Sequence, residues 1–411
     1  MPATSTANAA KRALTLPLRR ELVRAFPQRP FALRFWDGSV VPATVCGSPE
    51  FHARSPAALA HFVRAPGELG LGRAYVAGDL AADDLDAAFA VVDAWEPPSL
   101  GLGDRVRLML AAVPAAGTGG LPRIPSTELV LDGKRHSVAR DATAVRYHYD
   151  VGNAFFALFL DASMTYSCAL FSRGARTLEE AQQAKLALVA AKLDLQAGQR
   201  VLDVGCGWGS FAIHAATYHD VSVVGITLSA SQAELARQLV ARAGVGDRVE
   251  IRLADYRQLT DGPFDAIASI GMVEHVGDAQ IDRYAHTLRR LLAPGGRLLN
   301  HGIALLPADE DPTSDVFSNR YVFPDAEPLP LSRVQLAIER AGLRTTHMEV
   351  FMDDYARTLA EWTRRLDDRL DEAEQLAGAE RTRIWRLYLR AARRGFDVGL
   401  TSVYQVLASR A

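Results

Sequence analysis

The chain of 411 residues has little cysteine: only Cys46, Cys168 and Cys206 are present. The three residues are far apart in the sequence, and their spacing matches neither a disulfide framework nor a zinc site. We therefore expect free thiols, a reducing compartment and no bound metal ion.

Long hydrophobic runs and an excess of charge of one sign are also absent. No window approaches the roughly 18 uninterrupted apolar residues of a membrane-spanning helix, and the N-terminal stretch lacks the apolar core of a secretory signal. The formal net charge is −2, with charges of both signs spread along the chain, so no strong field attracts nucleic acid. These absences favour a cytoplasmic protein with at most peripheral membrane association, and they exclude nucleic acid as an expected partner.

The pattern along the chain predicts two domains. Residues 31–66 alternate short apolar runs with Asp-Gly, Pro and Gly-Ser, which is typical of a hairpin followed by a helix that begins near Ser55 and Pro56. The later stretch VPAAGTGGLPRIPST is rich in glycine and proline, as linkers are. We therefore predict a small α+β domain over residues 1–125 and a larger domain over residues 126–411.

The larger region alternates apolar strands with helical segments. The runs RVLDVG, VSVVGITLS, VEIRLAD, FDAIASIGM and GRLLNHGI predict an α/β fold with a doubly wound, mostly parallel sheet. LRTTHMEVF is a predicted sixth strand, and a helical insertion follows over about 355–398. The final run TSVYQVLAS alternates, which predicts a last, antiparallel strand at an edge of the sheet.

The first of these strands ends in a turn with three glycines, DVGCGWGS. At this place in an open α/β sheet a ligand is usually bound. Gly205 and Gly207 let the backbone approach a ligand, Gly209 lets the next helix pack on its strand, and Asp203 places a carboxylate before the turn. The spacing fits neither the dinucleotide fingerprint nor the phosphate loop. The carboxylate suits a sulfonium-bearing amino acid better, with a nicotinamide-type site or a plain glycine-rich turn as alternatives.

At these residues the chain resembles known families. Asp-x-Gly-x-Gly-x-Gly after a first strand is similar to the S-adenosylmethionine site of class I methyltransferases. From about residue 140 to its end, the chain more specifically resembles the cyclopropane-fatty-acyl-phospholipid synthases, which include the mycolic acid cyclopropane synthases. The matching pieces occur in the family's order: YHYDVGNAFFALFLDASMTYSCALF, LDVGCGWG, GITLSASQ, GMVEHVG, YVFPDAEPLPLS and DYARTLAEW. The resemblance implies a Rossmann-like class I methyltransferase fold, preceded by a less uniform domain for lipid, partner or dimer contacts.

The resemblance also implies an activity, transfer of a methyl group from S-adenosylmethionine to the double bond of an unsaturated phospholipid acyl chain. An alkene is a poor nucleophile, so the electrophile has to be held against it in a dry cavity. The resulting cation loses a proton to a positioned base. Loss from the new methyl group closes a cyclopropane, the product we favour, whereas loss elsewhere leaves a methylene or methyl-branched chain.

The same resemblance implies the residues of the site. A bound bicarbonate is the implied base, held by groups that match Cys168, Glu274, His301 and Tyr355, with the backbone near Ile303. Tyr149 is implied to line the reacting centre, where an aromatic face favours a developing cation. Together with Asp203, the implied cofactor-binding residues are Tyr166, Ser167, Gly205, Gly207, Thr227, Leu228, Gln232, Asp255, Tyr256 and Ile270.

Some residues depart from common patterns or have a plainer interpretation. GITLS offers Thr227 and Ser229 where many methyltransferases have an acidic residue for the ribose, an arrangement similar to that of the cyclopropane synthases. Val273 stands where the family more often has an aromatic or larger aliphatic residue, which could change the cavity and the product. His275 and His301 could each be a satisfied core or helix-capping histidine.

Partners and wider alternatives follow from the rest of the chain. ERTRIWRLYLRAARRGF mixes arginines with Ile384, Trp385 and Leu389, which suits an anionic lipid surface. We favour the alternative, in which the apolar residues pack on the sheet and the arginines pair with the nearby acidic run LDDRLDEAE. A homodimer, and a partner reductase for a methylene product, are further expected partners. A small-molecule methyltransferase or a non-catalytic lipid carrier would not need the complete set of base-site residues.

Overall fold

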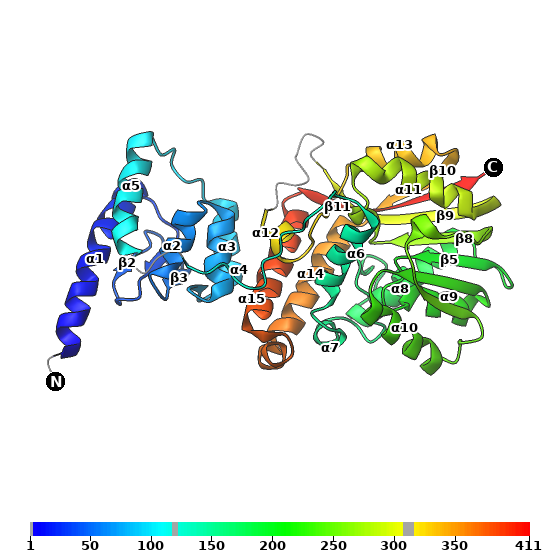
Figure 1. Ribbon diagram of the computed structural model, residues 1–411, viewed down its shortest axis with the longest axis horizontal. Coiled ribbons are helices and arrows are strands. Elements are labelled where there is room, and N and C mark those ends of the chain that lie inside the picture. The colour runs from blue at the N-terminus through cyan, green and yellow to red at the C-terminus, as the bar shows by residue number, and fades with distance from the viewer. Residues whose placement is uncertain (1–2, 117–121, 307–315) are drawn as a thin grey trace. The chain divides into compact units, whose positions relative to one another are not determined.

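The computed structural model describes residues 3–116, 122–306 and 316–411, which form two compact units (Figure 1). Unit 1 lies within residues 1–128 and 379–390, and unit 2 within 129–378 and 391–411. Segment 379–390 belongs to the helical insertion that the sequence analysis placed in the larger domain. It is tied to unit 1 by Arg383, whose Nε donates to the carbonyl oxygen of Val76 at 2.8 Å, and by Arg390, which pairs with Asp86 at 2.9 Å.

Unit 1 is an α+β unit built on a four-stranded sheet of order β2-β1-β3-β4. Strands β1 (Ala32–Arg34) and β2 (Val40–Val41) form the predicted hairpin, and Gly38 in its turn has a φ of +78°. Strand β3 (Glu50–Ala53) runs parallel to β1, and β4 (Leu80–Ala82) runs antiparallel to β3. The helices are α1 (Ala3–Ala25), α2 (Ala57–Arg64), α3 (Glu68–Ala77), α4 (Leu85–Ala94) and α5 (Leu102–Ala115).

Unit 2 contains a seven-stranded sheet of order β10-β11-β9-β8-β5-β6-β7. Neighbours among β5 to β9 are parallel, which confirms the predicted doubly wound sheet. The strands are β5 (Arg200–Val204), β6 (Ser222–Thr227), β7 (Val249–Leu253), β8 (Phe264–Ile270), β9 (Leu292–Leu305), β10 (Leu343–Val350) and β11 (Thr401–Arg410).

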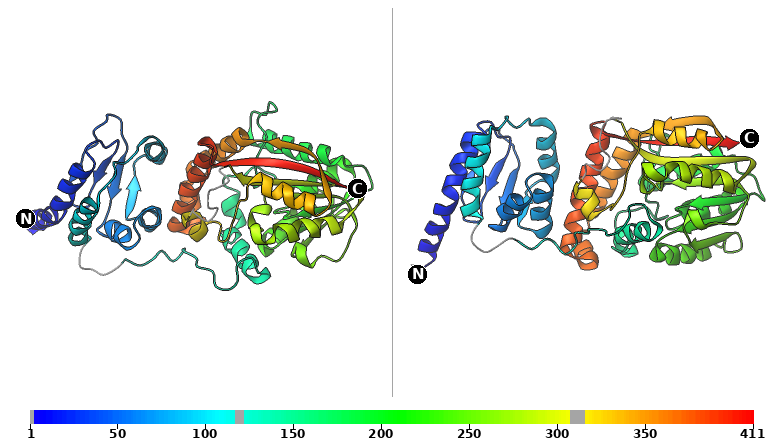
Figure 2. Two further views of the ribbon diagram at one scale, coloured as in Figure 1. Left: turned by 90° about the horizontal axis from the view of Figure 1, so that it is seen from above. Right: turned by 45° about the horizontal axis from the view of Figure 1, so that its top comes forward.

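The last strand corrects one prediction. β11 is antiparallel to its neighbours, as expected, but it is not an edge strand, because it pairs with β9 on one side and β10 on the other. Figure 2 shows this C-terminal strand in red within the sheet of unit 2. Residues 402–406 are buried, so both faces of this strand are covered although its sequence alternates.

Helices cover both faces of this sheet and form two cores. On one face α8 (Leu178–Leu193), α9 (Ser210–His219) and α10 (Ala230–Arg242) pack on strand residues such as Val201. On the other face α11 (Asp278–Leu291) and α13 (Leu331–Arg340) pack on residues such as Leu202 and Leu298. Successive residues Val201 and Leu202 therefore serve opposite cores, as a strand buried on both faces requires.

The remaining helical elements lie near the carboxyl ends of the parallel strands or in the insertion. They are α6 (Val138–Tyr149), α7 (Asn153–Phe156), η1 (Tyr256–Gln258), η2 (Val273–His275), α12 (Val316–Tyr321), α14 (Met352–Asp367) and α15 (Leu370–Asp397). Helix α15 is interrupted at Gly378, whose φ of +79° and ψ of 159° are not helical. None of the helices in the described ranges is long and apolar enough to cross a membrane.

The packing predicts how two leucines of unit 2 differ. Leu298 is fully buried between β9 and its covering helices, whereas Leu336 on α13 is 42% exposed. We expect Leu298→Ala to lower the free energy of unfolding by about 2–5 kcal/mol, because it leaves a cavity. Leu336→Ala should cost less than about 1 kcal/mol. Urea denaturation of both variants measures the difference, and equal losses would contradict this description of the core.

Candidate active site

The glycine turn after β5 has the backbone that only glycine adopts easily. Gly205, Gly207 and Gly209 have φ angles of +78°, +55° and +86°. A Cβ on Gly205 would lie 3.0 Å from Cγ of Met272, so the absence of a side chain at Gly205 lets the turn lie close to Met272. A Cβ on Gly209 would lie 3.5 Å from Cβ of Ala236, an ordinary contact. Gly209 is therefore required by its backbone angle and not, as the sequence analysis expected, by close packing of the helix.

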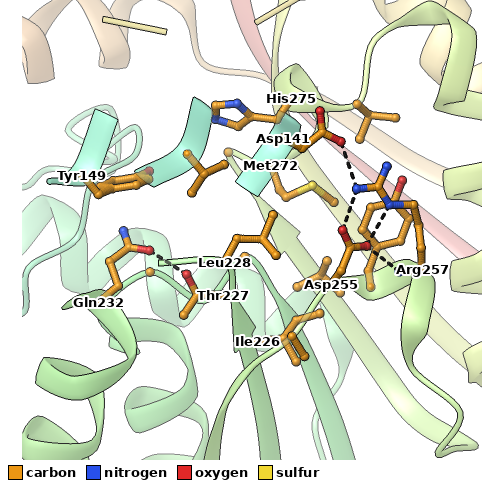
Figure 3. Close-up of a pocket in the computed structure, with 18 residues that line it drawn as sticks. Asp141, Tyr149, Ile226, Thr227, Leu228, Gln232, Asp255, Arg257, Met272 and His275 are labelled. Atoms are coloured by element: carbon orange, nitrogen blue, oxygen red, sulfur yellow. Dashed lines mark hydrogen bonds and ion pairs between the residues drawn. The ribbon is translucent and has the colours of Figure 1, made fainter. Parts of the chain in front are cut away.

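Two adjoining cavities open around this turn. The first, drawn in Figure 3, is lined by α6, by the ends of β5 and β6, by residues 254–257 and by segment 271–276. The second is lined by residues 164–167 of the TYSC segment, by Lys185 and Asp203, and by Ile270. Both are lined by Tyr149, Gly205, Gly207, Gln232 and Gly271. The two cavities therefore adjoin each other at the turn, and together they are called the hollow.

Each residue predicted to bind a cofactor lines this hollow. In the first cavity these are Gly205, Gly207, Thr227, Leu228, Gln232, Asp255 and Tyr256, and in the second they are Tyr166, Ser167, Asp203 and Ile270. Thr227 Oγ1 donates to Gln232 Oε1 at 2.7 Å, which fixes the amide beside the turn (Figure 3). Tyr149, predicted to line the reacting centre, lies opposite Gln232 where both cavities meet.

Buried charges concentrate in the second cavity. Asp203 is 2% exposed, and its Oδ2 has no hydrogen-bond partner among the described residues. Burial raises the pKa of Asp203 to about 7, and Lys185 opposes this rise. Lys185 is also 2% exposed, its Nζ donates to Ser167 Oγ at 2.9 Å, and burial lowers its pKa to about 8. An unpartnered carboxylate oxygen beside a bare glycine turn fits the ammonium group of an amino acid ligand.

The first cavity is bounded by a buried ionic cluster. The Arg257 guanidinium donates from Nε to Asp255 Oδ1 at 2.9 Å and from Nη2 to Asp141 Oδ2 at 2.9 Å (Figure 3). These bonds tie α6 to the end of β7 and raise the pKa of Arg257, with Asp255 as the main cause. The carboxylate that Asp255 would present to a ligand is therefore already hydrogen-bonded to Arg257.

Glu274 lies just beyond the end of β8, and His301 lies within β9 as the strand partner of Ile270, the last residue of β8. Glu274 Oε1 accepts from the backbone N–H of Ile303 at 2.6 Å, two residues beyond His301. Glu274 Oε2 and His301 Nε2 are buried and have no hydrogen-bond partner among the described residues. Burial raises the pKa of Glu274 to about 7 and lowers that of His301 to about 3. The expected backbone contribution near Ile303 is thus made to Glu274 itself.

Cys168 and Tyr355 both contact the backbone of Phe351. Cys168 is 2% exposed, its Sγ is 3.9 Å from the carbonyl oxygen of Phe351, and burial raises the pKa of its thiol. The N–H of Tyr355 donates to the same carbonyl, and the N–H of Phe351 donates to Val403, the β11 partner of Ile303. Backbone contacts thus connect these two residues to Glu274, although neither cavity is lined by any of the four predicted base-site side chains.

Several residues of the site were not predicted from the sequence. Lys185 occupies the buried face of α8 in phase with Ala181 and Val189, four residues away on each side. A lysine at such a position is a detectable signal, because an unpaired charge is costly to bury. Arg257 and Gln405 carry no comparable signal, since only the tertiary structure brings them to Asp141 and His301.

The mixed basic and apolar helix does not present its apolar residues to a surface. Ile384, Trp385 and Leu389 are each at most 2% exposed. Arg390 pairs with Asp86, and Arg393 pairs with Asp397. The apolar residues are therefore buried, as the alternative favoured from the sequence requires. The two acidic partners, Asp86 and Asp397, lie outside the run LDDRLDEAE that was expected to supply them.

The parallel sheet, its strand order and the glycine turn at the end of β5 define a class I methyltransferase fold. The model of the mycolic acid cyclopropane synthetase family matches residues 136–406. The chain belongs to this family of S-adenosylmethionine-dependent methyltransferases.

Individual relatives agree with this assignment. A probable fatty acid methyltransferase of Mycobacterium tuberculosis is 36% identical over 95% of this chain and 93% of its own length. The cyclopropane-fatty-acyl-phospholipid synthase of Escherichia coli K12 is 35% identical over 84% of each chain. The solved mycolic acid cyclopropane synthase CmaA1, complexed with SAH and CTAB, is 35% identical over 66% of this chain and 98% of its own, with a TM-score of 0.62.

The raised pKa of Glu274 predicts a pH-dependent stability difference. Between the ordinary value of 4.5 and about 7, the folded chain keeps a proton on Glu274 that the unfolded chain has released. Raising the pH through this window therefore destabilises the fold, by about 3 kcal/mol from this residue. Glu274→Gln removes this pH-dependent loss. The free energy of unfolding of the variant, relative to that of the parent, should therefore increase from pH 5 to pH 8.

Urea denaturation at both pH values measures this relative stability. The surface substitution Glu339→Gln on α13 is the matched control and should follow the parent chain at both values. A Glu274→Gln curve that also follows the parent would contradict the burial of Glu274.

Proposed function

We propose that this chain transfers a methyl group from S-adenosylmethionine to the double bond of an unsaturated phospholipid acyl chain and yields a cyclopropane. The observation that carries the proposal is the pair of unpartnered polar atoms, Glu274 Oε2 and His301 Nε2, on two segments that lie near the carboxyl end of β8. The relatives named for fatty acid methylation and for cyclopropane synthesis support the substrate class.

The residues around the glycine turn fit the cofactor. Asp203 offers a carboxylate oxygen without a partner, which suits the ammonium group of the methionine part. Lys185 and the Ser167 hydroxyl that it orients suit the carboxylate of the same part. Thr227, Leu228 and Asp255 line the cavity that would take the adenosine part. When bound, the sulfonium supplies an electrophilic methyl group.

Aromatic side chains surround Tyr149, which is proposed to line the reacting centre. Around Tyr149 lie the rings of Phe156 at 5.8 Å, Trp208 at 5.7 Å and Tyr166 at 6.3 Å between centroids. Such a cluster excludes water, and the faces of its rings favour a cation that develops on the alkene. In this proposal the aromatic residues orient the acyl chain and shield it from water. Glu274 and His301 assist the loss of a proton from the cation.

The base site is proposed to hold a bicarbonate ion. A neutral Glu274 carboxyl and a neutral His301 imidazole each offer a hydrogen-bond donor, and such donors compensate the charge of a small anion in a buried place. When bound, bicarbonate supplies the base that takes the proton. Cys168 and Tyr355, which contact the Phe351 carbonyl region beside Val403, are proposed as further members of this site.

The other expectations from the sequence stay predictions. They are the cytoplasmic location, peripheral contact with membrane lipid, a homodimer, and a partner reductase for a methylene product. The role of residues 1–125 in lipid, partner or dimer contacts belongs with them, as does the boundary near residue 125. The rival product, a methylene or methyl-branched chain, is favoured by the relative whose name gives only fatty acid methylation.

The decisive test is the lipid product made in cells. Cells with defined unsaturated fatty acids would express the parent chain, Glu274→Gln or the surface control Glu339→Gln, and phospholipids would be analysed by mass spectrometry and proton NMR. We expect a gain of one CH2 with high-field cyclopropane protons for the parent and the control. Loss of the positioned acid should reduce that product by about 10²–10⁴-fold in Glu274→Gln.

Exocyclic methylene signals would instead establish the rival product. No lipid change with folded protein that binds S-adenosylhomocysteine would overturn the lipid substrate.

The cofactor assignment is tested by comparing two ligands. S-Adenosylhomocysteine carries the amino acid part that Asp203 and Lys185 are proposed to bind, and 5′-methylthioadenosine lacks it. We expect Asp203→Asn or Lys185→Met to weaken S-adenosylhomocysteine by about tenfold or more, since a charged hydrogen bond is lost. Affinity for 5′-methylthioadenosine, measured by calorimetry, should hardly change. Equal losses for both ligands would indicate that the two residues act only on the fold.

A further inference from the structure

The base-site histidine is part of a longer chain of contacts that runs to the surface of unit 2. His301 Nδ1 lies 3.1 Å from Gln405 Nε2, and Gln405 Oε1 accepts from Lys192 Nζ at 2.6 Å. Lys192 Nζ also lies 2.6 Å from Glu349 Oε2. The four residues come from β9, β11, α8 and β10.

We propose that Gln405, oriented by Lys192, is a positioning residue that holds His301 in the neutral tautomer with its proton on Nε2. The catalytic consequence rests on the proposed function, whereas the tautomer itself follows from contacts that do not depend on it.

The donor and acceptor groups along these contacts determine the tautomer. An ammonium group only donates, so the side of the Gln405 amide that faces Lys192 must be its oxygen. The NH2 group of the amide then faces His301, and because it only donates, His301 Nδ1 must be the acceptor. A neutral imidazole that accepts at Nδ1 carries its proton on Nε2.

Burial and sheet register make this arrangement rigid. Gln405 is 1% exposed and His301 is 2% exposed, and the two residues are direct partners in the antiparallel pairing of β11 with β9. Burial also keeps the imidazole neutral by lowering its pKa. Glu349 pairs with Lys192 and with Arg173, and these two ion pairs fix the outer end of this series of side-chain contacts.

The proton on Nε2 decides what the site can bind. Nε2 has no hydrogen-bond partner among the described residues, so this tautomer offers a free N–H donor. The opposite tautomer would present a lone pair there, which repels an anion or an oxygen atom. Gln405 and Lys192 would therefore act on the reaction through His301, without contact with substrate or cofactor.

The test observes the imidazole directly. In the full chain with ¹⁵N-labelled histidine, the His301 signals are assigned as those missing from His301→Asn. We expect Nε2 to be protonated and Nδ1 unprotonated in the parent. In Gln405→Glu the new carboxylate only accepts, so Nδ1 should become protonated. Gln258→Glu on the exposed surface of η1 is the matched control and should keep the parental pattern.

Kinetics then separate a positioning role from a structural one. We expect Gln405→Glu to lower kcat by about tenfold or more while the KM for S-adenosylmethionine and the affinity for S-adenosylhomocysteine stay within about twofold. A parental spectrum with Nδ1 protonated, or a pattern unchanged in Gln405→Glu, would overturn the tautomer. An inverted tautomer with unchanged kcat would overturn the positioning role. A parent that binds cofactor but methylates no lipid would contradict the proposed function and leave the NMR result standing.

Discussion

The pairing of β11 with β9 is the constraint on which the arrangement of the site depends. It sets Gln405 opposite His301 and Val403 opposite Ile303 in one antiparallel register. The backbone of Val403 then accepts from Phe351, and so fixes the start of α14. A slip of one residue would turn each of these side chains to the opposite face of the sheet. A strand that is distant in sequence from the glycine turn thereby supports residues at the ends of the parallel strands.

The cost of this arrangement lies in buried groups that the chain leaves without partners. Asp203 and Glu274 each have an unpartnered oxygen, and burial raises the pKa of both carboxyl groups to about 7. Stability alone would favour apolar residues or complete hydrogen bonding at such places. Lys185 offsets part of the cost at Asp203, since its charge opposes the rise in that pKa. The remaining groups are therefore best explained by ligands that complete their hydrogen bonds.

The sequence predicts those features that follow from local pattern and from the topology of parallel strands. Alternating strands and helices predict the doubly wound sheet, and Glu274 just after one strand and His301 late in the next can be expected to lie at the same end of that sheet. The position of β11 could not be deduced, because an alternating strand fits an edge and the interior of a sheet equally well. Gln405 and Arg257 were missed for a related reason. Their partners Asp141 and His301 lie on distant segments, and spacing along the chain does not reveal such contacts.

The protonation states of the proposed base-site residues explain why the proposed reaction would need an added base. A histidine whose pKa is about 3 is a weak base near neutral pH, and its Nδ1 is already occupied by the Gln405 amide. Burial raises the pKa of Glu274, and its Oε1 accepts from the backbone of Ile303, so burial favours a protonated carboxyl that can donate from its free oxygen. Cys168 is a neutral thiol, since burial raises its pKa. These three groups are therefore better suited to donate hydrogen bonds to a small anion than to remove a proton themselves. A bound anion that accepts those bonds and takes the proton would use each group in the state that its burial favours.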